Sequence, residues 1–368
     1  MDAWTANESQ HMRHALGLAA LGLHTTAPNP RVGCVLVRDE RVVGEGWHER
    51  AGGPHAEARA LQSAGEAARG ATAYVSLEPC AAQGLTPPCT AALVAAGVRR
   101  VVYAADDPNP KMRGGAAALR DAGLEVAGGL LAAEARELNI GFFSRHERGR
   151  PWVRIKLGAS LDGRTALADG TSQWITGEAA RADAQLYRAR SSVILTGSGS
   201  VLKDDPSLNV RIDGASRQPL RAVLDSGLRV PPTARMYTLE GSATVFTASA
   251  DETRIGELRR VGVQIEKVGT AAAGGVDLTA VMARLAALQA NEVWVEAGAR
   301  LAGALLTAQL ADELVIYLAP CMLGPQGLPL AQLPPLGSLD ERLALRYVAV
   351  DRVGVDLRII ARPAAGDA

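Results

Sequence analysis

The chain has 368 residues, enough for about two domains with a hydrophobic core in each. Lys plus Arg and Asp plus Glu each number 39, and this zero net charge argues against a nucleic-acid-binding protein. The hydrophobic content of 48% excludes a disordered chain, and no apolar run approaches the roughly 18 residues of a membrane span. The first ten residues carry no export-signal pattern. We therefore expect a cytoplasmic protein that binds neither membranes nor nucleic acids.

The first part of the chain is predicted to alternate between helices and strands. Helices are expected at about 5–23, 57–68 and 90–96, and strands at 32–37, 41–47, 73–77 and 100–105. This alternation predicts a mainly parallel sheet with helices on both faces. Ligands of such sheets bind where strand ends meet helix starts.

The stretch from Gly53 to Cys89 carries the clearest chemical signal. His55 and Glu57 stand at the start of a predicted helix, and Cys80 and Cys89 each follow a proline. A zinc ion that activates water needs three protein ligands, an open position and a nearby carboxylate that is not a ligand. His-x-Glu followed by Pro-Cys and a second Cys matches the zinc-dependent base deaminases. We expect His55, Cys80 and Cys89 to bind zinc and Glu57 to move protons. Two cysteines used as thiolates favour a reducing compartment.

Longer motifs extend the pattern over nearly the whole chain. PNPRVGCVLV, HAE, LEPC, TPPC and DPNP occur in that order, followed by KLGASLDGRTA, SQWIT, LKDDPSLNVR and EAGARLAGALL. Together they resemble the family of bifunctional deaminase/reductases of riboflavin biosynthesis. The resemblance implies an α/β protein with a cytidine-deaminase-like α/β/α domain at 1–148 and a dihydrofolate-reductase-like α/β domain at 149–368.

The resemblance also implies two reactions. The first domain would hydrolytically remove an amino group from 2,5-diamino-6-(ribosylamino)-4(3H)-pyrimidinone 5′-phosphate. The second would reduce the ribosyl chain with NADPH to give 5-amino-6-(ribitylamino)uracil 5′-phosphate. The family pattern supports the same zinc ligands and the same role for Glu57, and it places Asn29 and Asn109 beside the pyrimidine.

One segment departs from the family. Between the cysteines the family usually carries Ser-His-His-Gly-Arg, whereas here the run is Ala81-Ala82-Gln83-Gly84-Leu85. Two imidazoles and a positive charge are missing. Zinc binding should not suffer, but contacts to the phosphorylated sugar are weakened, and with them substrate affinity or deaminase activity.

The second half predicts further strands at 153–157, 192–196, 291–295, 314–318 and within 345–360. Gly197 and Gly199 give only Gly-x-Gly, so the usual dinucleotide fingerprint is absent. A glycine-started helix at 298–304, next to a strand end, is suited to a cofactor phosphate.

Further site residues are carried over from the resemblance. Those expected to touch NADPH are Gly158, Trp174, Ser200, Asp204, Ser226, Gly298, Ala299, Arg300, Leu301, Ala302, Gly303 and Ala304. Those expected to touch substrate are Lys156, Ser172, Arg188, Leu208, Arg211 and Glu296. Arginines fit this role because a guanidinium can bind phosphate with two hydrogen bonds.

Two alternatives stay open at this point. Nucleic-acid-editing deaminases share His-x-Glu and Pro-Cys, although the charge balance disfavours them. The deaminase half could also have decayed into a non-catalytic module, given the departure at 81–85. We further expect a homo-oligomer, as is common for two-domain cytoplasmic enzymes.

Overall fold

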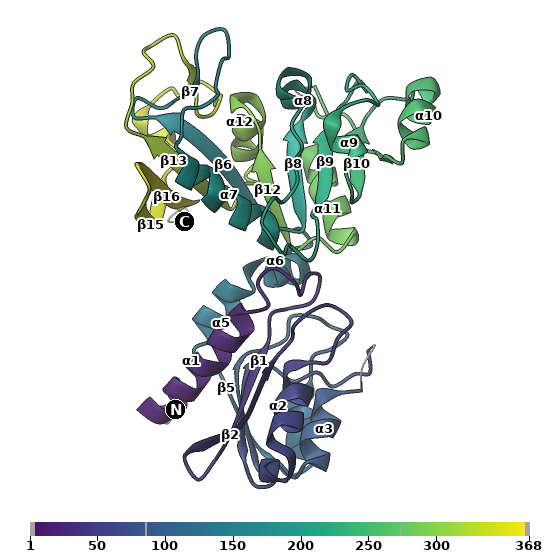
Figure 1. The fold of residues 1–368 in the computed structure, drawn as a ribbon, viewed down its shortest axis with the longest axis vertical. Coiled ribbons are helices and arrows are strands. Elements are labelled where there is room, and N and C mark those ends of the chain that lie inside the picture. Colours follow the sequence, from purple (N-terminus) through teal and green to yellow (C-terminus); the bar gives the residue numbers. More distant parts are fainter. Residues whose placement is uncertain (1–3, 85–86, 273, 365–368) are drawn as a thin grey trace. The chain divides into compact units, whose positions relative to one another are not determined.

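The computed structural model describes residues 4–84, 87–272 and 274–364, and the chain forms two compact units, Met1–Gly149 and Arg150–Ala368 (Figure 1). Within these described ranges no helix combines the length and the apolar character needed to cross a membrane. Leu85, which belongs to the segment that departs from the family, lies outside the described residues.

The first unit is built on a mixed sheet. Its strands are β1 (Gly33–Arg38), β2 (Arg41–Trp47), β3 (Thr72–Leu77), β4 (Arg100–Ala105) and β5 (Glu125–Gly128), in the order β2-β1-β3-β4-β5. The pairs β3–β4 and β4–β5 are parallel, but β1 runs antiparallel to both of its neighbours. The expectation of a mainly parallel sheet is therefore wrong. The two residues between β1 and β2, Asp39 and Glu40, both have positive φ and form a tight hairpin, which only antiparallel strands allow.

Helices cover both faces of this sheet. The helices are α1 (Ala6–Ala20), α2 (Ala56–Ala64), α3 (Cys89–Ala95), α4 (Gly115–Asp121), α5 (Ala132–Leu138) and α6 (Ile140–Arg148), with a 3₁₀ turn η1 (Gly65–Ala68) after α2. Strand β1 feeds two cores: Val35 packs with α1, α5 and α6, whereas Cys34 and Leu36 pack with α2, α3 and α4. This alternation follows from the period of two along a strand, and it gives the unit three layers.

The second unit contains a longer sheet. Its strands are β6 (Trp152–Ser160), β8 (Val193–Gly197), β9 (Leu220–Leu224), β10 (Ala243–Thr247), β11 (Gln264–Lys267), β12 (Glu292–Glu296), β13 (Glu313–Ala319), β15 (Leu345–Val353) and β16 (Asp356–Pro363). The order is β11-β10-β9-β8-β12-β6-β13-β16-β15, parallel from β11 to β13 and antiparallel beyond. A small ladder joins β7 (Arg164–Ala166) to β14 (Leu328–Pro329). Strand β12 is inserted between β8 and β6. The later strand β13 is then added on the other side of β6, so the order in which the chain adds strands to the sheet changes direction here. Such reversals open a crevice at the carboxyl ends of the strands.

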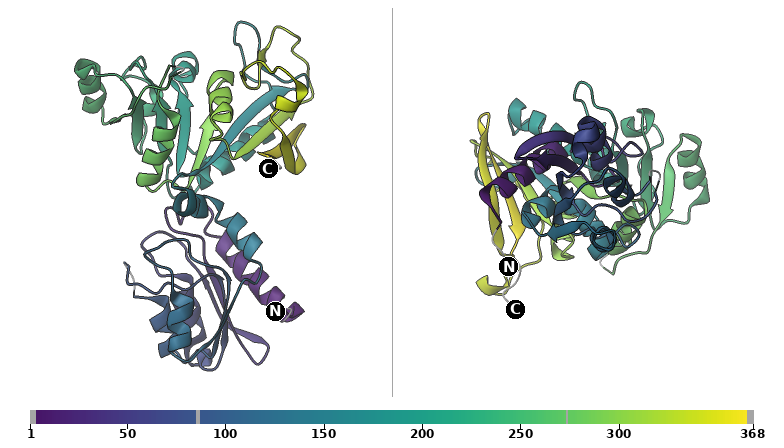
Figure 2. Two further views of the ribbon diagram at one scale, coloured as in Figure 1. Left: turned by 180° about the vertical axis from the view of Figure 1, so that it is seen from behind. Right: turned by 90° about the horizontal axis from the view of Figure 1, so that it is seen from below.

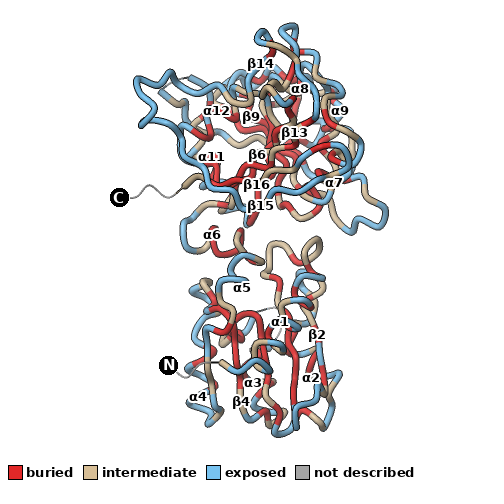
Figure 3. The backbone as a smooth tube through the Cα atoms, turned by 90° about the vertical axis from the view of Figure 1, so that its left-hand side faces the viewer, coloured by how far each residue is buried: buried red, intermediate tan, exposed pale blue. Residues whose placement is uncertain are grey.

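Helices again flank the sheet. One core gathers α11 (Leu278–Ala287) and α12 (Ala299–Thr307); the other gathers α7 (Glu178–Arg190), α8 (Ser198–Asp204), α9 (Arg235–Thr238) and α10 (Glu252–Arg260). A 3₁₀ turn η2 (Leu339–Glu341) precedes β15. The central strands of both units are buried, and the loops are exposed (Figure 3).

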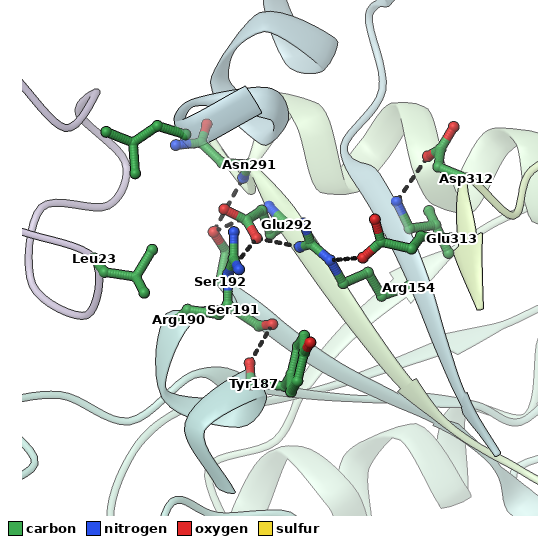
Figure 4. Close-up of polar contacts among 12 residues, drawn as sticks. Leu23, Arg154, Tyr187, Arg190, Ser191, Ser192, Asn291, Glu292, Asp312 and Glu313 are labelled. Atoms are coloured by element: carbon green, nitrogen blue, oxygen red, sulfur yellow. Dashed lines mark hydrogen bonds and ion pairs between the residues drawn. The ribbon is translucent and has the colours of Figure 1, made fainter. Parts of the chain in front are cut away.

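A buried ion network lies where the central strands of the second unit begin. Arg154 of β6 is bonded to Glu292 at the start of β12 and to Glu313 at the start of β13, the latter at 2.5 Å (Figure 4). Arg190 also contacts Glu292, at 3.1 Å, and Arg362 contacts Glu313, at 2.8 Å. Each buried carboxylate is thus paired with two arginines, and a buried charge requires such pairing.

The far edge of the same sheet is apolar and open. Strand β15 is the terminal strand, and the hairpin that it forms with β16 is visible at the edge of the sheet (Figure 2). Tyr347 is 74% exposed and Val350 is 54% exposed, and Leu357 of β16 is also exposed. Arg358, between Leu357 and Ile359, pairs with Asp183 of α7. Because side chains alternate along a strand, Leu357 and Ile359 project from the face opposite α7.

Candidate functional site

The three expected metal ligands come together in the first unit. His55 is the residue before α2, Cys80 follows β3, and Cys89 is the first residue of α3. His55 Nδ1 lies 3.2 Å from Cys89 Sγ and 3.6 Å from Cys80 Sγ, and the three candidate ligand atoms all lie within 4.8 Å of one another. Both cysteines are free thiols and buried. One imidazole and two thiols that converge without a disulfide fit the preferred ligands of zinc.

The surroundings of Cys80 favour ionised sulfur, whereas the hydrogen bond with Cys80, together with burial, raises the pKa of Cys89. The backbone N–H of Cys89 donates to Cys80 Sγ at 3.3 Å. Hydrogen bonding from Cys89 lowers the pKa of Cys80 to about 4 against the opposing effect of burial. A thiolate is the form of cysteine that binds metals.

Glu57 lies in the first turn of α2, two residues after His55, and is only 3% exposed. Burial raises the pKa of its carboxyl group, while its own backbone N–H and then His55 act in the opposite direction. The Glu57 carboxyl also contacts Cys89. A buried carboxyl with a raised pKa beside a metal cluster is suited to accept and return a proton.

Asn29 is held beside this cluster by a histidine that sequence reasoning missed. His48 Nδ1 donates to the carbonyl of Pro54 at 3.0 Å, so its Nε2 can accept from Asn29 Nδ2 at 3.1 Å. The His48 ring packs edge-on against His55 with centroids 5.4 Å apart. Burial lowers the pKa of His48, which keeps it neutral. The only sequence signal was a histidine at the end of a strand.

Glu78 is a second residue that sequence reasoning missed. It is buried just before Cys80, and its Oε2 accepts from Asp107 N at 3.2 Å. Its Oε1 accepts from the backbone N–H of Gly114, at 3.2 Å, and of Ala116, at 2.9 Å. Glu78 thus ties the cysteine-bearing loop to the DPNP turn.

Asn109, expected beside the substrate, lies in that turn. Its Oδ1 accepts from Lys111 N at 3.1 Å, and its backbone N–H donates to Asp107 Oδ1 at 2.8 Å. Burial raises the pKa of Asp107 to about 6. These two hydrogen bonds of Asn109 therefore shape the turn itself.

In the second unit, Arg188 and Glu296, both expected to touch substrate, form an ion pair with each other. Two hydrogen bonds join the guanidinium to the carboxylate, from Nε at 2.6 Å and from Nη2 at 2.7 Å. Trp294 Nε1 donates to the same carboxylate at 2.7 Å. Burial would raise the pKa of Glu296, but Arg188 outweighs it and the pKa falls to about 2. Glu296 is therefore ionised at neutral pH.

Lys156 is the neighbour of Glu296 across the parallel pair β6–β12. Its Nζ lies 3.2 Å from the place where a Cβ on Gly158 would stand, so the ammonium group lies directly over the Gly158 backbone. Burial lowers the pKa of Lys156, and Glu296 opposes this shift. A larger residue at 158 would displace the lysine.

The other expected substrate residues are more dispersed. Arg188 Nη1 donates to Asn209 O at 2.8 Å, which places the chain next to Leu208 near the Arg188–Glu296 pair. Leu208 is buried with a positive φ of 46°. Arg211 donates through its Nη1 to Asn209 Oδ1 at 3.2 Å. Among the described residues, Ser172 makes no hydrogen bond with this cluster.

The residues expected to bind NADPH lie mostly after carboxyl ends of strands. Ser200 and Asp204 are in α8, directly after β8, and Ser226 follows β9. Gly298 is the N-cap of α12, which follows β12. Because glycine has no side chain to cap the helix, the backbone N–H groups of residues 299–301 have no side-chain partner at this cap. Trp174 is 70% exposed. The guanidinium carbon of Arg181 lies over its ring, 4.6 Å from the ring centroid.

Two residues of the 298–304 run face protein rather than open space. Ala302 is fully buried in the core. A Cβ on Gly303 would stand 2.0 Å from Gln332 O, so this glycine permits close packing against a loop. The backbone N–H groups of α12 that a phosphate could reach are thus limited to its first turn.

Comparisons with known proteins identify the family of each half of the chain. Residues 5–105 match the model of the cytidine and deoxycytidylate deaminase zinc-binding region, and residues 151–359 match that of the RibD C-terminal domain. The riboflavin biosynthesis protein RibD of Escherichia coli (strain K12) is 47% identical, over 95% of this chain and 98% of its own length. The chain belongs to the RibD family.

Solved RibD structures extend the likeness to the fold. RibD of Acinetobacter baumannii, form 1, is 40% identical with a TM-score of 0.91 and covers 98% of this chain and 99% of its own. A Thermotoga maritima protein, described as a diaminohydroxyphosphoribosylaminopyrimidine deaminase/5-amino-6-(5-phosphoribosylamino)uracil reductase, is 31% identical with a TM-score of 0.85, covering 97% and 99%.

Membership of the RibD family settles the broad activity. The chain is a bifunctional enzyme of riboflavin biosynthesis, with a zinc-binding deaminase half and a reductase half that uses NADPH. The expected fold class is confirmed, and the nucleic-acid-editing alternative is set aside because both halves match RibD.

Proposed function

We propose that the chain converts 2,5-diamino-6-(ribosylamino)-4(3H)-pyrimidinone 5′-phosphate into 5-amino-6-(ribitylamino)uracil 5′-phosphate in two steps. The deaminase half hydrolyses the exocyclic amine, and the reductase half reduces the ribosyl chain. The observation that carries the proposal is the His55–Cys80–Cys89 cluster with the buried Glu57 carboxyl beside it. Full-length likeness to RibD supports the choice of substrates.

In the deaminase half, His55, Cys80 and Cys89 would hold zinc, which supplies an activated water nucleophile near neutral pH. Glu57 accepts the proton of that water and delivers it to the departing amine. Its burial suits this work because a carboxyl with a raised pKa returns a proton readily. Asn29, held by neutral His48, offers a polar side chain beside the cluster to orient the pyrimidine.

In the reductase half, NADPH supplies the hydride. The proposed cofactor contacts are Gly158, Trp174, Ser200, Asp204 and Ser226, with the first turn of α12 for a phosphate. Lys156 and the Arg188–Glu296 pair bind the sugar and its phosphate, together with Leu208, Arg211 and Ser172. Glu296 orients Arg188 through two hydrogen bonds, so the guanidinium meets the substrate in a fixed position.

The test is turnover of the diaminopyrimidinone phosphate by zinc-loaded protein. Ammonia release without NADPH, followed by NADPH oxidation when the cofactor is added, is the expected result. Ammonia release without reduction would contradict the reductase assignment. NADPH oxidation only when the deaminated intermediate is supplied would show that the deaminase half has decayed.

We also propose that the enzyme is a cytoplasmic homo-oligomer. Support for assembly comes from the β15–β16 edge, where Tyr347 and Val350 of the terminal strand and Leu357 of β16 expose apolar surface. Such an edge is stabilised by burial against an identical surface across a two-fold axis. Light scattering should give a dimer or larger, and Tyr347→Glu with Val350→Lys should give a monomer. A monomeric wild-type protein would contradict this. Free thiols at Cys80 and Cys89 support a reducing compartment.

A further inference from the structure

The segment that follows the ligand Cys80 brings no charge to the deaminase site. Ala81, Ala82, Gln83 and Gly84 are all uncharged. Around the same loop the structure places buried carboxyl groups instead, those of Glu57, Glu78 and Asp107. A substrate with a 5′-phosphate, as the proposed function requires, needs cations from elsewhere in the unit to bind here.

The DPNP turn lies against this uncharged segment. The backbone N–H of Ala81 donates to Met112 O at 3.0 Å. A Cβ on Gly84 would stand 3.0 Å from Met112 Cε, so the methionine side chain lies directly against that glycine. Lys111 and Arg113 flank Met112 in the chain. Two cations are therefore brought next to the loop that begins at the zinc ligand.

The turn that carries these cations is fixed by its own hydrogen bonds. Asn109 Oδ1 accepts from Lys111 N at 3.1 Å, and Asn109 O accepts from Met112 N at 2.9 Å and from Arg113 N at 3.0 Å. Glu78 anchors both ends of the turn through Asp107 N and Gly114 N. A preformed backbone lowers the entropy that binding must overcome.

Both cations are available to a ligand. Lys111 and Arg113 are exposed, and among the described residues neither takes part in an ion pair. Arg59, another cation near the cluster in sequence, is already paired with Glu49 at 2.8 Å. Lys111 is also the sole lysine in the sequence from 1 to 149.

We propose that Lys111 and Arg113 bind the 5′-phosphate of the deaminase substrate and set the preference for a phosphorylated over an unphosphorylated pyrimidine. The inference rests on the proposed function. It assigns to the DPNP turn the positive charge that the 81–84 segment does not supply.

The test compares the phosphorylated diaminopyrimidinone with its dephosphorylated form on zinc-loaded full-length protein. Each single change, Lys111→Ala or Arg113→Ala, should lower kcat/KM for the phosphorylated substrate on the order of tenfold, and the double change roughly 10²-fold. Most of the loss should appear in KM. Turnover of the dephosphorylated form should not change, and Lys111→Arg should restore most of the preference.

Control variants remove other exposed cations. Arg41 begins β2 at the β1–β2 hairpin, at the end of the strands away from Asn29 and His48, and Arg41→Ala should leave the preference unchanged. Arg50 lies in the turn before His55. If Arg50→Ala abolishes the preference while the Lys111/Arg113 double variant retains it, the inference is overturned.

Binding separates this inference from the proposed function. In zinc-loaded Glu57→Gln protein, calorimetry with the two ligands measures the contribution of the phosphate without turnover. Loss of the phosphate preference on adding Lys111→Ala and Arg113→Ala supports the inference even if the wild type releases no ammonia, an outcome that would count against the deaminase reaction alone. An unchanged preference overturns the inference, whatever the turnover.

Discussion

The two halves of the chain assemble their sites in different ways. In the deaminase half, His55, Glu57, Cys80 and Cys89 fall within one short stretch, at the starts of α2 and α3 and after β3. In the reductase half, Lys156, Arg188 and Glu296 come from β6, α7 and β12, far apart in sequence. The first site depends on a metal to hold its parts together, whereas the second depends on a parallel sheet and an ion pair. Loss of the metal should therefore disrupt the first site, and loss of the ion pair should disrupt the second.

The largest effect is expected from loss of a zinc ligand. Cys89→Ser should reduce bound zinc from about one ion per chain to nearly none and abolish ammonia release, because three ligands are needed to retain the ion. NADPH oxidation with the deaminated intermediate should be unaffected. Cys321→Ser, at an exposed cysteine outside the cluster, is the matched control. Metal analysis with both assays checks this, and retained zinc in Cys89→Ser would contradict the ligand assignment.

The next effect separates chemistry from metal binding. Glu57→Gln should keep the zinc but lower kcat for ammonia release by ~10²–10⁴-fold, the range for a lost general acid–base group. The exposed Glu66→Gln in η1 should behave as wild type. Equal rates for Glu57→Gln and wild type would show that another group moves the proton.

In the reductase half the corresponding change acts on stability as well as on binding. Glu296→Gln leaves the buried Arg188 without its partner and should destabilise the second unit by about 3 kcal/mol. It should also raise KM for the reductase substrate. Glu266→Gln removes the surface pair with Arg284 and should destabilise the second unit far less, because solvent screens an exposed ion pair. Urea unfolding followed by tryptophan fluorescence compares the two variants. Equal losses of unfolding free energy would contradict the role of burial.

The pH dependence follows from the lowered pKa of Glu296. Its folded-state pKa of about 2 is below the ordinary value of 4.5. Its stabilising contribution is therefore complete above pH about 4.5 and is lost as the pH falls toward about 2. Unfolding midpoints measured across this range should fall less steeply for Glu296→Gln than for the wild type. Parallel curves would show that the Arg188–Glu296 pair does not contribute.

The smallest effects test close packing in each half. A Cβ on Gly115 would stand 1.7 Å from Pro79 O, next to Cys80, and one on Gly303 would stand 2.0 Å from Gln332 O. Either change to alanine should cost about 1–3 kcal/mol. Only Gly115→Ala should also weaken zinc binding, measured by competition with a chelator. Gly17→Ala, with open space around it, is the control and should not destabilise.

The sequence was most informative where the residues of a site lie close together in the chain. The zinc cluster could be predicted because a short motif identifies it, and the strands at 41–47 and 100–105 because each is a short run that begins with Arg-Val-Val. The pairing of the strands at 32–37 and 41–47 was expected, but the antiparallel direction of β1 was not, since helix–strand alternation by itself predicts parallel strands. His48 and Glu78 were missed because their partners, Asn29 and the backbone around Gly114, are remote in sequence. The partners of Glu296 were reached only through a family resemblance.

The buried network around Arg154 has a consequence for how the second sheet can form. Its partners, Glu292 and Glu313, begin the two strands on either side of β6. If β6 slipped by one residue against either neighbour, the guanidinium would turn to the opposite face. The buried Arg154 charge would then lose both carboxylates, and Glu292 and Glu313 would each keep one arginine fewer. Other registers of these strands are thereby less stable than the native one. The alignment of Lys156 with Glu296, the two residues proposed to bind substrate, is therefore set by charges at the other end of the same strands.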